Sequence, residues 1–391
     1  MFALGAFLAC ASATADWGPD NERALNELMR EPVRFPNPTA ATLWGGAQAR
    51  KAANQPLTAN ATLSAQGIKC PLLIQKNGAK AKPARLLVYL PGMFNNLNDP
   101  LLIRGFNRFA RLGHHLLTMP NPWSEDYIRS GAKTRPGEIE LEAEQILRAI
   151  HEAVRAIGPR NVEGIDVAGD SDGAFLGAVT FAKDRESKAP ILDGSLTLFG
   201  PPLHFDKALA AMDRRIDDSR EKYFRDCSSK VQVVPILANL LSAPSQLWLN
   251  PHTLDCADSI FAFRAFQAFA VRAAIAIDET WNLGSIPTDA ETWKRNLTFR
   301  GFLKNYSPGG LKTANDPVKA DLGYWLNQSS QRGPLNLRIL TSRDELVNEI
   351  ADWSADPHFH FTEKNTRFVP WGGHLGWEAL QDFDLVVRSA F

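Results

Sequence analysis

The chain has only four cysteines among its 391 residues, and no two of them form a Cys-x-x-Cys pair. Four are too few for a disulfide scaffold, and the missing pair argues against a structural zinc site. The chain also lacks an excess of either charge, because 43 Lys and Arg balance 43 Asp and Glu. A nucleic-acid binder needs a basic excess to release counterions from phosphate, so we expect no nucleic-acid partner.

Long apolar runs are also scarce, and the one we find covers residues 1–15. Fifteen residues are too short for a membrane span, which needs about 20, so we expect no stable span. Ala13-Thr14-Ala15 before Asp16 has the form of a signal-peptidase site, and we expect a signal peptide at 1–15 and an exported, periplasmic or secreted protein. A lipid anchor on Cys10, or a buried N-terminal element of a cytoplasmic protein, are the alternatives.

Export would leave three cysteines, of which Cys227 and Cys256 lie in one segment. We favour a disulfide between these two, with Cys70 as the odd thiol, although two buried free thiols remain an alternative. The sequence does not determine the oligomeric state.

Apolar residues make up 45% of the chain and charged residues 22%, which is typical of a globular protein. After an irregular leader at 16–60, strand-like and helix-like segments alternate, and each is bounded by Gly or Pro. We expect strands at 85–90, 115–119, 164–168 and 192–199, and helices at 99–112, 138–157 and 174–183. The alternation predicts an α/β fold with a mostly parallel sheet and right-handed crossovers.

The alternation stops at residue 203 and resumes with strands at 335–341 and 366–370. Residues 203–331 have helical spacing throughout and carry many aromatic side chains. About 130 residues far exceed one crossover, so we predict a helical lid over the carboxyl edge of the sheet. The core would then be divided into a first part at 61–202 and a second part at 332–391.

Gly169-Asp170-Ser171-Asp172-Gly173 has the form G-x-S-x-G between a predicted strand and a predicted helix. A strand–turn–helix of this kind presents a serine above the sheet, and its glycines avoid clashes at the turn. The alternative is an ordinary turn in which Ser171 or Asp170 caps the helix. A serine hydroxyl needs a base that is oriented by a third group.

We identify His374, in the glycine-rich turn Trp371-Gly372-Gly373-His374, as the candidate base. Asp344, directly after the strand at 335–341, is the candidate acid. We expect the neighbouring Glu345 to point to the other side of the turn. The chain order Ser171, Asp344, His374 is the order found in α/β-hydrolases.

With these motifs in order, the sequence resembles the α/β-hydrolase superfamily, and its Gly-Gly-His-Leu-Gly-Trp box resembles a carboxylesterase-like branch. The resemblance implies a Ser171 nucleophile, a His374 base and an Asp344 acid. It also implies an oxyanion hole formed by the backbone N–H groups of Asp172 and Met93, with Phe94 as the alternative to Met93. It implies an enzyme, a serine hydrolase of small-molecule esters or acyl compounds, with no cofactor and no metal.

Two alternatives to an esterase remain at this stage. A serine peptidase could use the same triad, and the fold could persist in a catalytically silent binding protein. The acidic neighbours Asp170 and Asp172, and Pro91-Gly92 where relatives have His-Gly, motivate the second alternative. His358 and His360 share a strand face and could bind a metal, but without a third ligand nearby we favour surface or packing roles.

Overall fold

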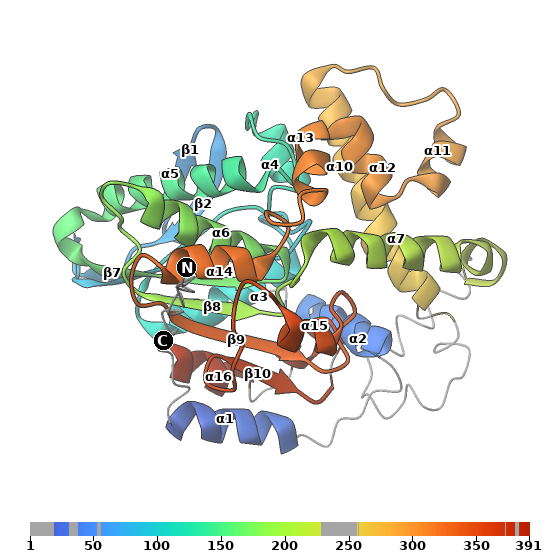
Figure 1. Cartoon of the computed structure of the whole chain (residues 1–391). Coiled ribbons are helices and arrows are strands. Elements are labelled where there is room, and N and C mark those ends of the chain that lie inside the picture. The colour runs from blue at the N-terminus through green and yellow to red at the C-terminus, as the bar shows by residue number, and fades with distance from the viewer. Residues whose placement is uncertain are drawn as a thin grey trace, which may run out of the picture.

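The computed structural model describes residues 19–30, 38–52, 56–227, 256, 258–371, 373–379 and 383–391 (Figure 1). The predicted signal peptide and Cys10 lie outside these residues. The leader is helical where it is described, with α1 at Pro19–Arg30 and α2 at Pro38–Ala52.

An eight-stranded sheet forms the centre of the molecule, in the order β1-β2-β6-β5-β7-β8-β9-β10. The strands from β6 to β10 run parallel, while β1 and β2 form an antiparallel hairpin whose second strand pairs antiparallel with β6. The strands are β1 (Ala61–Ala65), β2 (Ile68–Leu73), β5 (Ala84–Leu90), β6 (His115–Thr118), β7 (Val162–Asp170), β8 (Ser195–Phe199), β9 (Asn336–Ser342) and β10 (Thr366–Val369), besides a small hairpin of β3 (Lys76–Asn77) and β4 (Lys80–Ala81). The predicted α/β fold with a mostly parallel sheet is confirmed.

Helices cover both faces of the sheet (Figure 1). On one face lie α5 (Ile139–Ile157), α6 (Asp172–Glu186) and α14 (Leu322–Ser330), and on the other α3 (Pro100–Phe109) and α16 (Phe383–Ala390). Four isoleucines of α5 lie on one helical face and form a buried isoleucine stripe: Ile139, Ile146, Ile150 and Ile157. An ion pair at 2.6 Å between Arg108 of α3 and Asp384 of α16 joins the second pair of helices.

One predicted strand begins three residues later than expected. The strand expected from residue 192 begins at Ser195, because the carboxylate of Asp184 accepts the backbone N–H groups of Ile191 and Leu192. Those two residues therefore bond to a helix side chain instead of joining the sheet ladder.

The regular elements in the described part of residues 203–331 are helices joined by loops, apart from one isolated bridge between His204 and Asp321. After α7 (Phe205–Lys222), the helices α10 (Ala268–Trp281), α11 (Ala290–Asn296), α12 (Phe299–Tyr306) and α13 (Pro308–Ala314) stand away from the sheet (Figure 1). Two π-helical turns, Tyr223–Cys227 and Phe261–Gln267, belong to the same insertion. We refer to residues 203–331 as the insertion; that it works as a lid stays a prediction.

The favoured cysteine pairing is present within the insertion. Cys227 and Cys256 form a disulfide with their Cα atoms 5.7 Å apart. Cys70 is buried and free, and burial raises the pKa of its thiol to about 12. A thiol held in this protonated state is a poor nucleophile.

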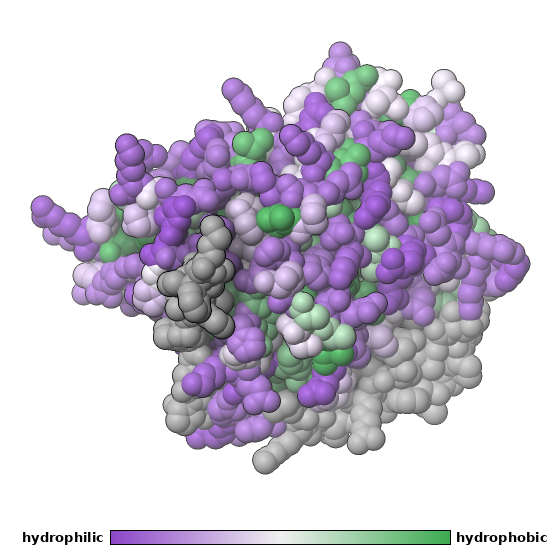
Figure 2. Space-filling model, in the orientation of Figure 1, coloured by the Kyte–Doolittle hydropathy of each residue, from purple (hydrophilic) through white to green (hydrophobic). Residues whose placement is uncertain are grey.

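Within the described residues, one helix, Asp258–Trp281, is long and apolar enough to cross a membrane. Of its most apolar window, 69% is buried inside the protein. A buried core helix of a soluble protein passes the same test, so this helix is weak evidence for a membrane span. The face of the molecule in Figure 2 is mostly hydrophilic, with small separate hydrophobic spots.

Candidate active site

Ser171 lies at the sharp turn between β7 and α6. Its backbone has φ 53° and ψ −122°, a conformation that non-glycine residues rarely adopt and that is typical of strained functional turns. A Cβ on Gly173 would lie 2.2 Å from the carbonyl oxygen of Leu90, and one on Gly169 would lie 2.4 Å from that of Gly173. Only glycine fits at either position, and the tight turn raises the hydroxyl above the end of the strand.

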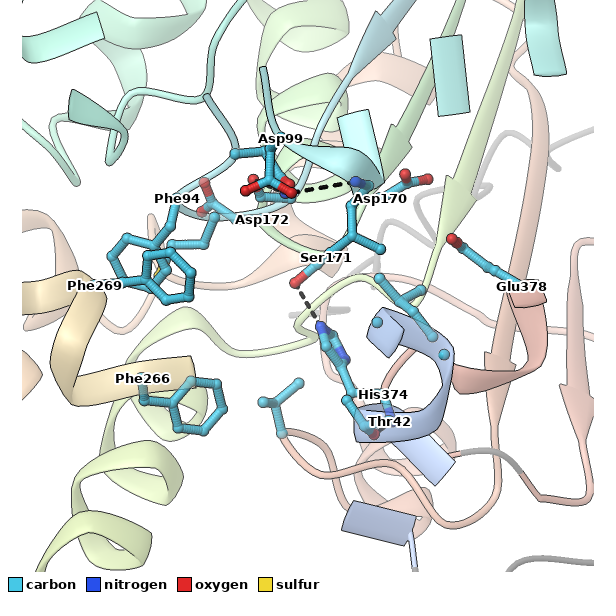
Figure 3. Close-up of a pocket in the computed structure, with 18 of the residues that line it drawn as sticks. Thr42, Phe94, Asp99, Asp170, Ser171, Asp172, Phe266, Phe269, His374 and Glu378 are labelled. Atoms are coloured by element: carbon cyan, nitrogen blue, oxygen red, sulfur yellow. Dashed lines mark hydrogen bonds between the residues drawn. The ribbon is translucent and has the colours of Figure 1, made fainter. Parts of the chain in front are cut away.

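The imidazole of His374 is oriented between a serine and a carboxylate. Its Nε2 lies 2.7 Å from Ser171 Oγ (Figure 3). Its Nδ1 lies 2.7 Å from Oε1 of Glu345. The side chain of Glu345 is only 2% exposed, so water screens its interaction with the ring very little. A hydroxyl, an imidazole and a carboxylate in line are the arrangement that activates a serine nucleophile.

The expectation that Asp344 contacts the imidazole is wrong. Oδ1 of Asp344 instead accepts the backbone N–H of Gly373 at 2.9 Å, and Glu345 reaches the ring. Both residues follow β9, so the sequence placed a carboxylate here correctly. The path of the turn after Ser342, where Arg343 N–H bonds to the carbonyl of Val369, decides which of the two side chains faces the ring.

Met93 and Asp172 lie beside the serine on two different segments. Asp172 is the first residue of α6, and the loop after β5 passes so close to the serine that a Cβ on Gly92 would lie 3.2 Å from Ser171 Cβ. In the described part of the chain, neither Met93 nor Asp172 donates its backbone N–H in a hydrogen bond. Two unused donors next to a nucleophile can stabilise an oxyanion.

The acidic neighbours of the serine are held away from it by hydrogen bonds. Oδ2 of Asp172 accepts the side-chain N–H of Asn121 at 2.8 Å, and Oδ2 of Asp170 accepts the hydroxyl of Tyr89 at 2.5 Å. Burial raises the pKa of each carboxyl from 3.8 to about 6. Both groups therefore exchange protons more readily near neutral pH than an exposed aspartate does.

A cavity of about 650 Å³ opens in front of Ser171 and His374. Phe94, Phe266 and Phe269 gather on one side of the serine (Figure 3). The last two come from the insertion, which therefore supplies much of the apolar wall. That wall consists of Phe94, Phe205, Leu209, Met212, Ile260, Phe261, Phe266 and Phe269.

The other side of the cavity is polar. Arg104 and Arg108 each donate a guanidinium N–H to the backbone carbonyl of Glu378, at 3.1 and 2.9 Å. Burial, and then the charge of Asp170, raise the pKa of the Glu378 carboxyl well above its usual value. The carboxyls of Asp170 and Glu378 both lie to the right of Ser171 in Figure 3, on the side opposite the phenylalanines. A substrate in this cavity would therefore contact rings on one side and hydrogen-bonding groups on the other.

The leader contributes to the site, which the sequence analysis did not anticipate. Thr42 Oγ1, on α2, accepts the backbone N–H of His374 at 2.8 Å, and the same hydroxyl donates to the carbonyl of Pro38. A Cβ on Gly373 would lie 2.0 Å from that carbonyl oxygen, so the histidine loop and α2 are in close contact. No local pattern in residues 38–52 indicates this, because the contact joins segments more than 300 residues apart.

The strand order of the sheet and the position of Ser171 together decide the fold. An antiparallel first hairpin, a central parallel sheet, and a serine at a sharp turn between the central strand β7 and the next helix are its defining features. The chain has the α/β-hydrolase fold. The insertion lies between β8 and β9, and the glutamate and the histidine follow β9 and β10.

The solved structures that are similar to the chain include those of two esterases and a peptidase. An esterase from Pyrobaculum calidifontis matches with a TM-score of 0.42 and 14% identity over 95% of each chain. A Pyrococcus furiosus esterase matches with a TM-score of 0.42 and 11% identity over 87% of this chain and 90% of that one. Acylaminoacyl peptidase from Pyrococcus horikoshii matches with a TM-score of 0.39 and 10% identity over 82% of this chain. The match covers only 37% of the length of that peptidase.

No family model matches the chain, and no curated protein matches it. At identities and TM-scores this low, it is the strand order and the serine turn that identify the fold.

Proposed function

We propose that the protein is a serine hydrolase that cleaves carboxylic esters through an acyl-enzyme. The observation that carries this proposal is the continuous line from Ser171 Oγ through His374 to Glu345, with 2.7 Å at each contact. In this proposal Glu345 takes the role that the sequence analysis gave to Asp344. The unused N–H groups of Met93 and Asp172 support an oxyanion hole at the same place.

The reaction follows from this geometry. Ser171 Oγ attacks the carbonyl carbon while His374 Nε2 takes the hydroxyl proton, and the carbonyl oxygen gains the negative charge. The N–H groups of Met93 and Asp172 donate to that oxygen. Collapse of the tetrahedral intermediate breaks the ester C–O bond, and the leaving alcohol takes the proton from His374. Water then attacks the acyl-serine in the same way, which releases the carboxylic acid and restores the serine.

The cavity favours substrates that have one apolar part. The phenylalanine wall beside Ser171 can bury an alkyl or aryl group, which stabilises binding by about 0.8 kcal/mol per buried CH₂. The polar wall around Glu378 and Arg104 suits a part that forms hydrogen bonds. Esters of apolar acids or alcohols are therefore the substrates we propose.

A fluorophosphonate probe tests the nucleophile directly. We expect it to label the wild type and not Ser171→Ala, with circular dichroism showing that the variant is folded. Equal labelling of both proteins would falsify the proposal. A folded wild type that is never labelled would favour a silent binding protein, the reading motivated by Asp170 and Asp172.

A survey of p-nitrophenyl esters against peptide amides tests the substrate class. We expect ester hydrolysis that depends on Ser171 and His374, with much slower cleavage of amides. Hydrolysis of amides at rates equal to or above those of matched esters would instead identify a peptidase that uses the same residues.

We also propose that the protein is exported after cleavage near Asp16. The support is the apolar, uncharged run at residues 1–15 with its Ala-x-Ala site, together with the disulfide in the insertion. Intact-mass measurement on protein from its native source is the test. A mass that includes residues 1–15 defeats this proposal, and a diacylglycerol on Cys10 would replace it with a lipid anchor.

A further inference from the structure

Three metal-ligating side chains meet where the insertion joins the core. His204 directly precedes α7, and Asp321 directly precedes α14. Asp356 follows α15 (Ile350–Ala355) in the second part of the core. One ligand atom of each residue lies within 4.8 Å of those of the other two. The cluster therefore draws on both ends of the insertion and on a third segment outside it.

The backbone holds the first two residues in register. His204 and Asp321 form an antiparallel bridge, flanked by hydrogen bonds from Phe205 N–H to the carbonyl of Ala320 and from Leu322 N–H to that of Leu203. His204 Nδ1 lies 3.1 Å from Asp321 Oδ2. Two ligands at 2.0–2.1 Å from one tetrahedral ion lie roughly 3.3 Å apart, so this pair already has the required spacing.

Asp356 supplies the observation that points to a ligand. Its Oδ1 accepts the backbone N–H groups of His358 and Phe359, each at 2.8 Å. Its Oδ2 is shielded from solvent and has no hydrogen-bond partner among the described residues. A buried carboxylate oxygen without a partner is destabilising, and a cation beside it removes that penalty.

A glycine lets the carboxylate approach the cluster. A Cβ on Gly323, in the first turn of α14, would lie 2.2 Å from Oδ1 of Asp356. Any other residue at this position would displace the Asp356 carboxylate from its place. The close approach of two carboxylates and an imidazole is therefore built into the backbone.

We propose that His204, Asp321 and Asp356 bind one divalent transition-metal ion, with Zn²⁺ as the best match. One imidazole and two carboxylates are ligands that Zn²⁺ accepts, whereas Ca²⁺ and Mg²⁺ prefer oxygen ligands alone. Water can complete the coordination. His358 and His360, the pair that the sequence analysis considered for a metal, are not members of this cluster.

The ion would fasten the insertion to the core and take no part in the hydrolysis. None of the three residues is among those that line the cavity at Ser171. Both ends of the insertion and the segment after α15 would be crosslinked at one point. The inference is therefore independent of the proposed function, and each can fail without the other.

Metal uptake by the full chain, without an affinity tag, tests this proposal. After treatment with EDTA and dialysis, we expect one equivalent of Zn²⁺ per chain by isothermal titration and elemental analysis, and a rise in Tm. Co²⁺ should give the visible absorption of a four-coordinate site. CaCl₂ and MgCl₂ at the same concentration should leave Tm unchanged.

Substitutions of single residues, with a matched control, test which side chains bind the ion. Asp356→Asn and His204→Gln should each weaken Zn²⁺ binding at least tenfold, while His360→Gln, which removes an exposed histidine nearby in sequence, should bind as the wild type does. Absence of stoichiometric Zn²⁺ uptake, or equal uptake by all variants, overturns the proposal. If the variants fail to fold, a wild type that lacks the Co²⁺ spectrum overturns it as well.

Discussion

Asp344 and Glu345 are neighbours in the chain but act on different atoms of the histidine loop. Asp344 accepts a backbone N–H of that loop, whereas Glu345 contacts Nδ1 of the ring. A carboxylate at Nδ1 holds the tautomer in which Nε2 can accept the serine proton, and it stabilises the imidazolium that forms. The two side chains therefore make distinct contributions that substitution can separate.

We expect Glu345→Gln to lower kcat on a p-nitrophenyl ester by about 10³–10⁴-fold, because the amide no longer stabilises the imidazolium or selects its tautomer. Asp344→Asn should lower kcat by about tenfold or less, since an amide oxygen can still accept the N–H of Gly373. Steady-state kinetics of both isosteric variants, beside their thermal unfolding, measure the difference. A greater loss of kcat in Asp344→Asn would return the acid role to Asp344.

Asp172 combines a helix N-terminal position with a buried carboxyl whose pKa is raised from 3.8 to about 6. The folded protein holds this proton more tightly than the unfolded chain does. The protonated carboxyl therefore makes its full contribution to the free energy of unfolding below pH 3.8, and this contribution is lost as the pH rises through about 6. The free energy of unfolding lost over this pH range is at most about 3 kcal/mol.

We expect Asp172→Asn to raise Tm relative to the wild type, by an amount that grows between pH 4 and 6 and is constant above that range. The amide oxygen can still accept from Asn121, so the hydrogen bond is retained. Thermal unfolding of both proteins from pH 4 to 8 measures this. A difference in Tm that does not vary with pH would show that the carboxyl does not titrate as described.

At the scale of elements, the insertion and the loop after β5 meet across the cavity. Phe269 of α10 stacks on Phe94, with ring centroids 5.2 Å apart, and both line the space in front of the serine. The backbone of Phe94 has a φ of 69°, so the loop is held in a conformation that aims this ring at the insertion. The apolar wall is thus shared between the loop after β5 and the insertion.

We expect Phe269→Ala to lower kcat/KM for a p-nitrophenyl octanoate by about tenfold or more, and for the acetate by less than threefold. A long acyl chain loses the ring that it packs against, whereas an acetyl group does not reach it. Phe224→Ala is the matched control, because Phe224 packs within the insertion and is not among the residues lining the cavity. Equal losses of kcat/KM for the two esters would show that this ring of the insertion does not bind the acyl chain.

At the scale of the whole molecule, α2 near the start of the chain contacts the loop that carries the base near its end. Thr42 on α2 accepts the backbone N–H of His374, 332 residues away in sequence. The hydroxyl therefore acts as a positioning group for the base. It does not touch the reacting atoms.

We expect Thr42→Val to lower kcat by about tenfold, because the His374 N–H loses its acceptor and the ring is held less firmly. Thr42→Ser should restore kcat, since it keeps the hydroxyl. Steady-state kinetics and thermal unfolding of both variants distinguish positioning from stability. A Thr42→Val protein with full kcat, or a serine variant that is equally impaired, would contradict a positioning role.

Much of the fold followed from local patterns in the sequence. Short apolar runs that end in Gly or Pro predict the parallel strands, since buried strands carry apolar residues on both faces. The isoleucine stripe predicts α5, and glycines around Ser171 predict the sharp turn, because only glycine fits there. The long helical interruption likewise predicts the insertion from its period and length. Each of these features depends on residues close together in the chain.

The tertiary structure alone decided which side chains meet. The sequence by itself determined that a carboxylate follows β9 and that His374 follows β10, but the path of the turn after Ser342 selects Glu345 over Asp344. The contact of Thr42 with the histidine loop and the cluster of His204, Asp321 and Asp356 join segments that share no local period. Such contacts depend on how packed elements place their ends in space, which the patterns of single segments do not encode.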